Sequence, residues 1–218
     1  MPHDDYITLP HPRSTVQPMT SHELSTAQQS MRNMSFAVVD FETTGLNPET
    51  DRIVQLAAVI VNGDGDITDS FDTIVKPESP GEYQHGAEHI HGISAEQVAN
   101  GMPLQTALEK LWGISAGNVF TAHNAQFDLG FLHAESERVG IKDQIEVHID
   151  TLELSKRTTS ADDTRRHNLL ALCEHYGIER DKVHDARSDA TATAQLLMHL
   201  IKELGVESPD QVAELFAP

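Results

Sequence analysis

Three acidic motifs follow one another along the chain, and each stands where an apolar segment begins or ends. Residues 40–45 read DFETTG and close an apolar run that starts at Phe36. Residues 123–128 read HNAQFD and follow a short apolar run at 119–122. Residues 184–189 read HDARSD and open a segment with helical periodicity. If the three motifs form one site, the fold must bring carboxylates from three separate elements to one point.

The rest of the pattern predicts an α/β fold. Short apolar runs bounded by turns indicate strands, and 3.6-residue periodicity indicates helices. The expected strands are 36–41, 52–61, 66–75, 119–122 and 145–149. The expected helices are 94–100, 103–111, 125–139, 169–176 and 186–204, and a further one starts after Ser208. The NGDG turn at 62–65 predicts a hairpin. Three antiparallel hairpin-linked strands, followed by alternating helices and strands, predict a mixed sheet flanked by helices.

Composition divides the chain into three parts. Residues 1–34 are polar and rich in proline, which predicts a flexible tail with a marginal helix near 21–32. Residues 35–204 form the expected domain, and 205–218 a short, helical C-terminal extension. The chain has no run of 18 apolar residues, no secretory signal pattern and one cysteine, Cys173 in an apolar stretch. These features predict a cytoplasmic protein.

The net charge of −19 argues against a broad basic surface that coats nucleic acid. It leaves open an enzyme that holds one strand end in a pocket. Seven of the fifteen basic residues gather in one stretch: Lys156, Arg157, Arg165, Arg166, Arg180, Lys182 and Arg187. They are either ordinary solvated surface or a local phosphate track beside the third motif.

In the first motif, Asp40 and Glu42 stand two residues apart on a strand, so both point to one face, while Phe41 points to the other. Two carboxylates that share a buried strand end repel each other, and a divalent ion removes that conflict. Oxygen ligands suit Mg²⁺ or Mn²⁺. The competing interpretation is a solvent-exposed strand end. Beyond Glu42, residues 43–45 supply hydroxyls and a glycine, Gly45, that would let a nucleotide approach closely.

The second motif places Asp128 in the first turn of the helix 125–139, with Asn124 as its N-cap. The helix dipole favours a carboxylate there even without a metal. The position of the motif supports the functional interpretation. His123 and Asn124 directly follow a strand that should end at the same edge of the sheet as Asp40. Phe127 could present its ring to a base.

The third motif opens a helix with a small apolar stripe, which would let it lie close to the sheet: Ala186, Ala190, Ala194, Leu197 and Ile201. With Asp185 as N-cap, Asp189 falls in the first turn and His184 on the preceding loop. A fixed carboxylate can hold a metal, and a mobile imidazole can accept a proton from water near neutral pH. Alternatively, His184 is a surface histidine.

In this order the motifs resemble those of the DnaQ-like 3′–5′ exonucleases of the DEDDh class, named for four carboxylates and a histidine. The resemblance covers about residues 35–204 and includes IHGI at 90–93 and RHNLLALC at 166–173. Within the class, ETTG at 42–45 and LC at 172–173 are similar to the proofreading epsilon subunits of bacterial DNA polymerase III. The resemblance implies a ribonuclease H-like fold with a five-stranded sheet.

The resemblance also implies roles for individual residues. It implies two divalent ions, Mg²⁺ or Mn²⁺, with Asp40, Glu42 and Asp189 holding one. Asp40 also contacts the second ion, and Asp128 acts through a bound water. His184 would be the general base. The expected pocket for the terminal nucleotide is formed by Thr43, Thr44, Gly45, Ile90, His91, Asn124 and Phe127.

The expected reaction is hydrolysis of single-stranded or frayed DNA from its 3′ end to nucleoside 5′-monophosphates, in proofreading or repair. An alternative is a 3′–5′ exoribonuclease of the ribonuclease T or oligoribonuclease type, since these motifs do not read a 2′-hydroxyl. A non-catalytic polymerase-associated binding module would be favoured by a missing carboxylate, and all four are present. The segment 211–216, QVAELF, loosely resembles peptides that dock on the bacterial sliding clamp, or else packs as an amphipathic helix on its own domain.

Overall fold

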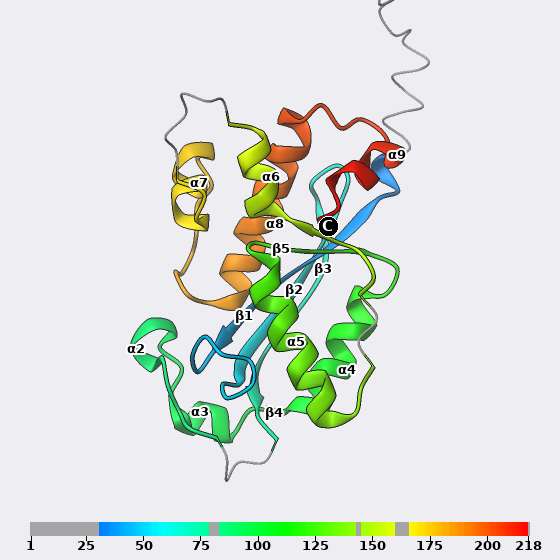
Figure 1. Ribbon diagram of the computed structural model, residues 1–218. Helices are drawn as coiled ribbons and strands as arrows, with labels where there is room; N and C mark the ends of the chain where they lie inside the picture. The colour runs from blue at the N-terminus through cyan, green and yellow to red at the C-terminus, as the bar shows by residue number, and fades with distance from the viewer. Residues whose placement is uncertain (1–30, 79–82, 143–144, 160–165, 218) are drawn as a thin grey trace, which may run out of the picture.

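A six-stranded mixed sheet forms the centre of the computed structural model, which describes residues 31–78, 83–142, 145–159 and 166–217 (Figure 1). The strand order is β4-β3-β2-β1-β5-β6. The strands are β1 (Ser35–Thr43), β2 (Ile53–Asn62), β3 (Ile67–Lys76), β4 (Met102–Pro103), β5 (Val119–Ala122) and β6 (His148–Asp150). The pairs β1–β2 and β2–β3 are antiparallel, whereas β3–β4, β1–β5 and β5–β6 are parallel. The predicted mixed sheet of hairpin-linked and parallel strands is confirmed.

The expected count of five strands is wrong by one, because β4 adds a sixth strand. This two-residue strand pairs in parallel with Val75 and Lys76 at the sheet edge. Two residues are too few to show any periodicity, and Pro103 lacks the N–H group of a regular strand residue. The last strand is also shorter than expected, since β6 begins at His148 rather than at Ile145.

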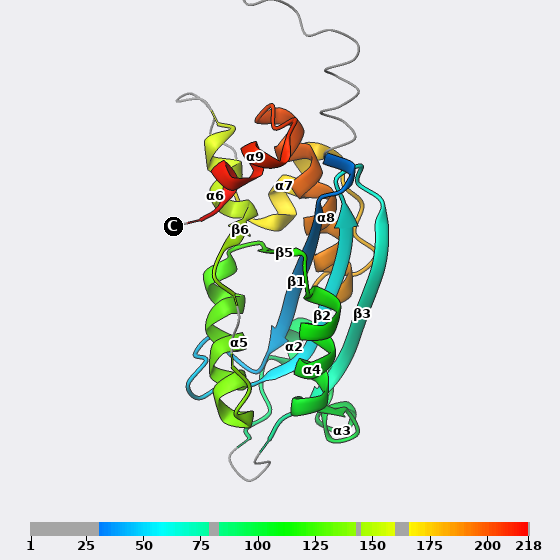
Figure 2. The same ribbon diagram turned by 90° about the vertical axis from the view of Figure 1, so that its right-hand side faces the viewer.

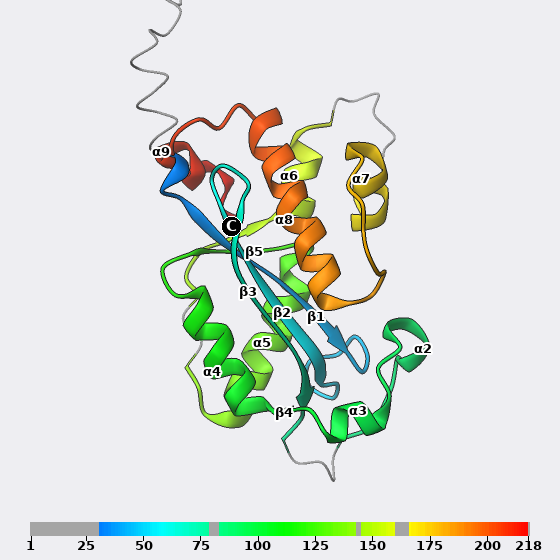
Figure 3. The ribbon, with the colours of Figure 1, turned by 180° about the vertical axis from the view of Figure 1, so that it is seen from behind.

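Helices cover both faces of the sheet (Figures 2 and 3). They are α2 (Glu88–His91), α3 (Ala95–Ala99), α4 (Leu104–Ser115), α5 (Ala125–Val139), α6 (Thr151–Arg157), α7 (Leu169–Tyr176), α8 (Ala186–Glu203) and α9 (Pro209–Val212), followed by the 3₁₀ helix η1 (Ala213–Leu215). The pattern did not predict α2 and α6. Along β1, Val38 packs with the helices of the α8 layer and its neighbour Val39 packs with α4 and α5. The alternation of β1 therefore separates two cores.

Helix α8 lies against the sheet through the predicted stripe of small residues. Ala186 and Ala190 are fully buried and Ala194 is 1% exposed. The carboxylate of Asp185 accepts a hydrogen bond from the backbone N–H of Ser188 at 3.2 Å, so Asp185 is the N-cap as predicted. This cap sets where α8 begins relative to the strands, and hence where the first turn of the helix places its side chains.

The two ends of the described domain pack onto the same core. Residues 1–30, most of the predicted tail and of its marginal helix, lie outside the described residues. Met31, which the sequence assigns to that tail, is buried in the α8 layer. At the other end, α9 begins after Ser208 as predicted, and Val212 and Leu215 are buried. Packing on its own domain is therefore the interpretation of residues 211–216 that the structure favours over an exposed clamp-binding peptide.

No described helix is long and apolar enough to cross a membrane.

We expect Ala190→Leu to lower the free energy of unfolding by about 1–3 kcal/mol, because the added side chain has no room between α8 and the sheet. Urea denaturation measures the change. Gln195→Leu on the exposed side of the same helix is the control and should stay within about 0.5 kcal/mol of wild type. Equal stability of the two variants would contradict close packing of this helix.

Candidate active site

The first motif places two carboxylates on the α8 face of β1. Asp40 and Glu42 continue the alternation of Phe36 and Val38, which pack in the α8 layer. Across the antiparallel pair, Glu42 lies opposite Gln55 of β2. The Gln55 side-chain oxygen accepts a hydrogen bond from the backbone N–H of Ala186 at 3.2 Å. This bond attaches the start of α8 to the sheet beside Glu42.

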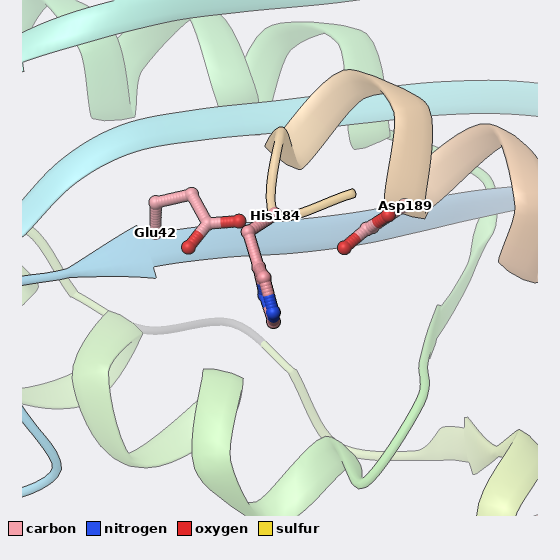
Figure 4. Close-up of side chains that lie close together, drawn as sticks. All are labelled: Glu42, His184 and Asp189. Atoms are coloured by element: carbon pink, nitrogen blue, oxygen red, sulfur yellow. The ribbon is translucent and has the colours of Figure 1, made fainter. Parts of the chain in front are cut away.

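The third motif meets the first at this point. Glu42, His184 and Asp189 each offer a potential metal-ligand atom, and these atoms all lie within 4.8 Å of one another (Figure 4). Glu42 comes from β1, His184 from the loop before α8, and Asp189 from the first turn of α8. Glu42 and Asp189 are buried and His184 is exposed. The placement of His184 on the loop and of Asp189 in the helix is as predicted.

The second motif contributes Asp128 from the first turn of α5, where it is buried. Burial raises the pKa of this carboxyl, hydrogen bonds from the backbone N–H groups of Asp128 and Phe41 lower it, and the charges of Asp150 and Glu42 raise it further. The charge of Asp128 in turn raises the pKa of Asp40. Asp128 is therefore near enough to Asp40 and Glu42 for the charges to act on one another, although α5 packs on the other face of β1 and Asp128 is not one of the three residues within 4.8 Å.

Burial and mutual repulsion destabilise the ionised form of these carboxyls and so raise their pKa values. Burial, then Asp189 and Asp185, raises the pKa of Glu42 from its ordinary value of 4.5 to about 7. Burial is also the first cause that raises the pKa of Asp40 and of Asp128 well above the usual range. Ionised carboxylates therefore gather here only if positive charge offsets them.

A buried arginine supplies part of that charge. The Arg180 Nε donates a hydrogen bond to Asp189 Oδ1 at 3.0 Å, and its Nη2 contacts the same oxygen. Both side chains are almost fully shielded from solvent, with exposed fractions of 7% and 9%. Burial raises the pKa of Asp189, and the bond from Arg180 works against that rise.

The loop after β1 is shaped by its own side chains. The Thr43 hydroxyl donates to the carbonyl of Gly45 at 2.6 Å, and the Thr44 hydroxyl accepts from the backbone N–H of Arg52 at 3.0 Å. A Cβ on Gly45 would lie 2.4 Å from the Asp51 carboxylate. The structure therefore explains Gly45 by the close approach of Asp51.

The segment before α3 also packs on this loop. A Cβ on Gly86 would lie 2.4 Å from the carbonyl oxygen of Thr44. His91 is buried, its Nδ1 accepts from the backbone N–H of Ile93 at 2.9 Å, and its Nε2 bonds with the carbonyl of Gly86 at 3.2 Å. Both ring nitrogens of His91 are thus used within the loop. Ile90, by contrast, is 48% exposed.

The start of α5 depends on a residue that the motif does not contain. Asn124 occupies the N-cap position with a left-handed backbone (φ 62°), and its side chain caps no N–H group of this helix. Instead, the Asp150 carboxylate accepts from the backbone N–H groups of Asn124 and Ala125 at 3.0 and 3.1 Å. Asn124 is the N-cap residue as predicted, but its side chain does not cap the helix, because the end of β6 brings the Asp150 carboxylate to these N–H groups. Phe127 is half-buried and its ring packs against Phe131.

Arg180, Asp150 and Gln55 are the site residues that the motifs did not identify. Arg180 stood among seven clustered basic residues without anything to distinguish it, because its partner is set by the loop between α7 and α8. Asp150 carried a local signal, a carboxylate at a strand end directly before a helix, of the kind that marks an N-cap. Gln55 carried none, since its role depends on strand register.

The basic cluster does not act as one unit. Lys156 pairs with Glu153, Lys182 with Asp185 and Arg187 with Asp72, all at exposed positions, and Arg157 donates to the carbonyl of Glu214. Arg165 lies outside the described residues. These pairings favour ordinary solvated surface for most of the cluster and single out Arg180.

The donor set suits a hard divalent ion. The carboxylate oxygens of Glu42 and Asp189 come within 4.8 Å of each other, and the His184 imidazole lies beside them within the same distance. Oxygen-rich sites favour Mg²⁺ and Mn²⁺ over softer metals. A cation bound beside these carboxyls would offset the burial and repulsion that raise the pKa of Asp40 and Glu42.

Solved structures that share this fold are nucleases with the ribonuclease H-like fold. The nuclease domain of 3′hExo, described as a DEDDh family member bound to rAMP, matches with a TM-score of 0.67 and 19% identity, over 78% of this chain and 92% of that one. Exonuclease I of E. coli in complex with a dT13 oligonucleotide matches with a TM-score of 0.65 and 19% identity, over 84% and 43%. At this identity the likeness establishes the fold.

Sequence comparison identifies the family. Residues 37–197 match the RNase_T exonuclease family, and the chain belongs to it. It is 33% identical to a PolC-type DNA polymerase III of Thermotoga petrophila over 85% of this chain, and 33% identical to the 3′-5′ exonuclease DinG of Bacillus subtilis over 80%. The chain spans only 13% and 18% of the length of these relatives. The prediction of a DnaQ-like 3′–5′ exonuclease of the DEDDh class is confirmed.

We expect the stability of the protein in EDTA to fall as pH rises from about 4.5 to about 7. Because the pKa of Glu42 is raised to about 7, the folded protein binds more protons than the unfolded chain in this window. Glu42 alone should contribute about 3 kcal/mol to this loss. Mg²⁺ should restore stability at the upper pH, where the carboxylates are ionised.

Urea denaturation at both pH values, with EDTA or Mg²⁺, measures this effect. Glu42→Gln should remove part of the pH dependence, whereas Glu174→Gln at an exposed position of α7 should not. Wild-type protein with the same stability at both pH values in EDTA would contradict the buried, repelling cluster.

Proposed function

We propose that this exonuclease removes nucleotides one at a time from the 3′ end of single-stranded or frayed DNA and releases nucleoside 5′-monophosphates, in proofreading or repair. The observation that carries the proposal is the meeting of Glu42, His184 and Asp189 within 4.8 Å at the end of β1. The electrostatic coupling of Asp40 to Asp128 and Asp189 supports it. DNA is the substrate we favour because the PolC-type relatives are DNA polymerases by name.

The carboxylates would hold two divalent ions, Mg²⁺ or Mn²⁺. Asp40, Glu42 and Asp189 would hold one, and Asp40 would also contact the second, with Asp128 acting through a water. When bound, the ions supply Lewis acidity that lowers the pKa of a water and offsets the charge of the leaving 3′ oxygen. Asp128 and Asp189 are fixed for this purpose in the first turns of α5 and α8, where the helix dipoles favour negative charge.

His184 is suited to accept the proton of the attacking water. Its ring reaches the carboxylates from the solvent side, and its backbone is left-handed (φ 56°), which turns it away from the path of α8. The Asp189 carboxylate lies beside it to stabilise an imidazolium. His123 is less suited to this step, because burial lowers its pKa to about 4 and its Nδ1 is bonded to the Thr151 hydroxyl.

The pocket for the terminal nucleotide would be formed by the loop after β1, the exposed Ile90 of α2, and Asn124 and Phe127 at the start of α5. Thr43, Thr44, Gly45 and His91 would act by shaping these loops, because their side chains or close contacts are used internally. Among them we expect exposed groups, Ile90 and Asn124, to touch the nucleotide directly.

Asp189→Ala should lower the turnover of a 3′-labelled oligonucleotide in Mg²⁺ by at least about 10³-fold, since it removes a ligand from the ion that assists attack. The assay uses matched single-stranded DNA, duplex DNA with a frayed end, and RNA, and follows release of labelled monophosphate. Glu109→Ala, at an exposed position of α4, is the matched control. Circular dichroism of both variants checks that a loss of turnover is not a loss of fold.

Near-normal turnover by the Asp189→Ala variant would refute the site. Wild-type protein that degrades RNA much faster than DNA would replace the proposed substrate with the exoribonuclease alternative while leaving the site intact.

His184→Ala should slow hydrolysis by about 10²- to 10⁴-fold and leave Mn²⁺ binding in place, since the variant loses a proton acceptor but keeps the carboxylates. The wild-type rate should rise with pH, as general-base catalysis requires, and this rise should disappear in the variant. Rates measured from about pH 6 to 9 test both points. A variant with the pH profile of wild type would contradict a base role.

A further inference from the structure

Arg180 occupies a position that the proposed mechanism does not use. It lies in the loop between α7 and α8, and its guanidinium is directed at Asp189 with both Nε and Nη2 on one carboxylate oxygen. Its charge also acts on Asp40 and Glu42, where it lowers the pKa of each carboxyl. Arg180 is therefore placed inside the carboxylate cluster and not on its rim.

This placement is distinct from that of the neighbouring cations. The Lys182 side chain is 61% exposed and lies 3.5 Å from Asp185, and the Arg187 side chain is 58% exposed and pairs with Asp72. Exposed pairs of this kind contribute little to stability. Arg180 and Asp189, by contrast, are shielded together, so loss of either partner would leave a charge buried alone.

The Asp189 carboxylate can interact either with Arg180 or with a divalent ion bound beside Glu42. It belongs to the group with Glu42 and His184 whose ligand atoms gather within 4.8 Å, and it also holds Arg180. A divalent ion bound at this group would bring two positive charges next to a guanidinium that cannot lose its proton. The ion and Arg180 would then repel each other while both attract the same carboxylates.

We propose that Arg180 is a built-in counter-ion that neutralises Asp189 in the absence of metal and competes with divalent ions for the carboxylate cluster. It stabilises the fold before the metal binds, and it raises the metal concentration at which the site fills. This inference rests on the proposed metal site. As a consequence, the enzyme binds metal more weakly than it would without Arg180, and its metal-free form is more stable.

The test is Mn²⁺ binding by the full chain, measured by isothermal titration calorimetry, with melting curves in EDTA and in Mn²⁺. The main variant is Arg180→Gln, which removes the charge and keeps a hydrogen-bonding side chain. Arg180→Lys keeps the charge. Arg187→Gln, on the exposed pair with Asp72, is the matched control.

Arg180→Gln should bind Mn²⁺ roughly tenfold more tightly than wild type, because one unit of positive charge next to the ion is removed. The same variant should melt at a lower temperature in EDTA, so the rise in melting temperature on adding Mn²⁺ should be larger than in wild type. Arg180→Lys and Arg187→Gln should keep the affinity of wild type within about threefold.

Weaker Mn²⁺ binding by both Arg180 variants would overturn the proposal, since it would show that the arginine orients Asp189 for the metal. Unchanged affinity in Arg180→Gln would also overturn it. A variant that stays unfolded even in saturating Mn²⁺ would contradict it as well, because the ion should take over the neutralisation of Asp189. Wild-type protein that binds no Mn²⁺ would instead refute the proposed metal site itself.

Discussion

The repulsion among carboxylates at the end of β1 is the interaction on which the rest of this structure depends. Asp40, Glu42, Asp128 and Asp189 come from three separate elements, and burial raises the pKa of each. The protein offsets this repulsion with the N-terminal ends of α5 and α8, the backbone N–H of Phe41 and the guanidinium of Arg180. Together these groups cancel only part of the repulsion, because the pKa values of the carboxyls stay raised. The cluster is therefore suited to bind further positive charge.

The cluster keeps its geometry only if the starts of α5 and α8 stay fixed relative to the sheet. Gln55 bonds to the first N–H of α8, and Asp150 bonds to the first N–H groups of α5 as well as capping its own helix, α6. Both bonds run from strands to helix starts. The carboxylates in the first turns are therefore positioned by the sheet, and the spread of the motifs over the sequence does not reduce the precision of the site.

The parts of the fold that the sequence predicted are those with a local cause. The bounds of α5 and α7 agree with the predicted ranges 125–139 and 169–176, and Asp185 caps α8 as its position indicated. The meeting of Glu42, His184 and Asp189 was also predictable, because strand alternation and helix turns fix those directions. Two predictions failed for different reasons. The strand β4 is too short to carry a pattern. The side chain that caps α5 comes from Asp150, 26 residues away in sequence from Asn124, so it depends on the tertiary fold.

The same distinction applies inside the motifs. Thr43, Thr44, Gly45 and His91 stand next to the carboxylates or between the motifs, which suggested contact with a nucleotide. In the structure the threonine hydroxyls close the loop after β1, Gly45 leaves room for Asp51, and His91 bonds to its own loop through both ring nitrogens. Residues of one motif can therefore have two roles. Some are suited to bind metal or substrate, and others fix the shape of the loop that leads to the carboxylates.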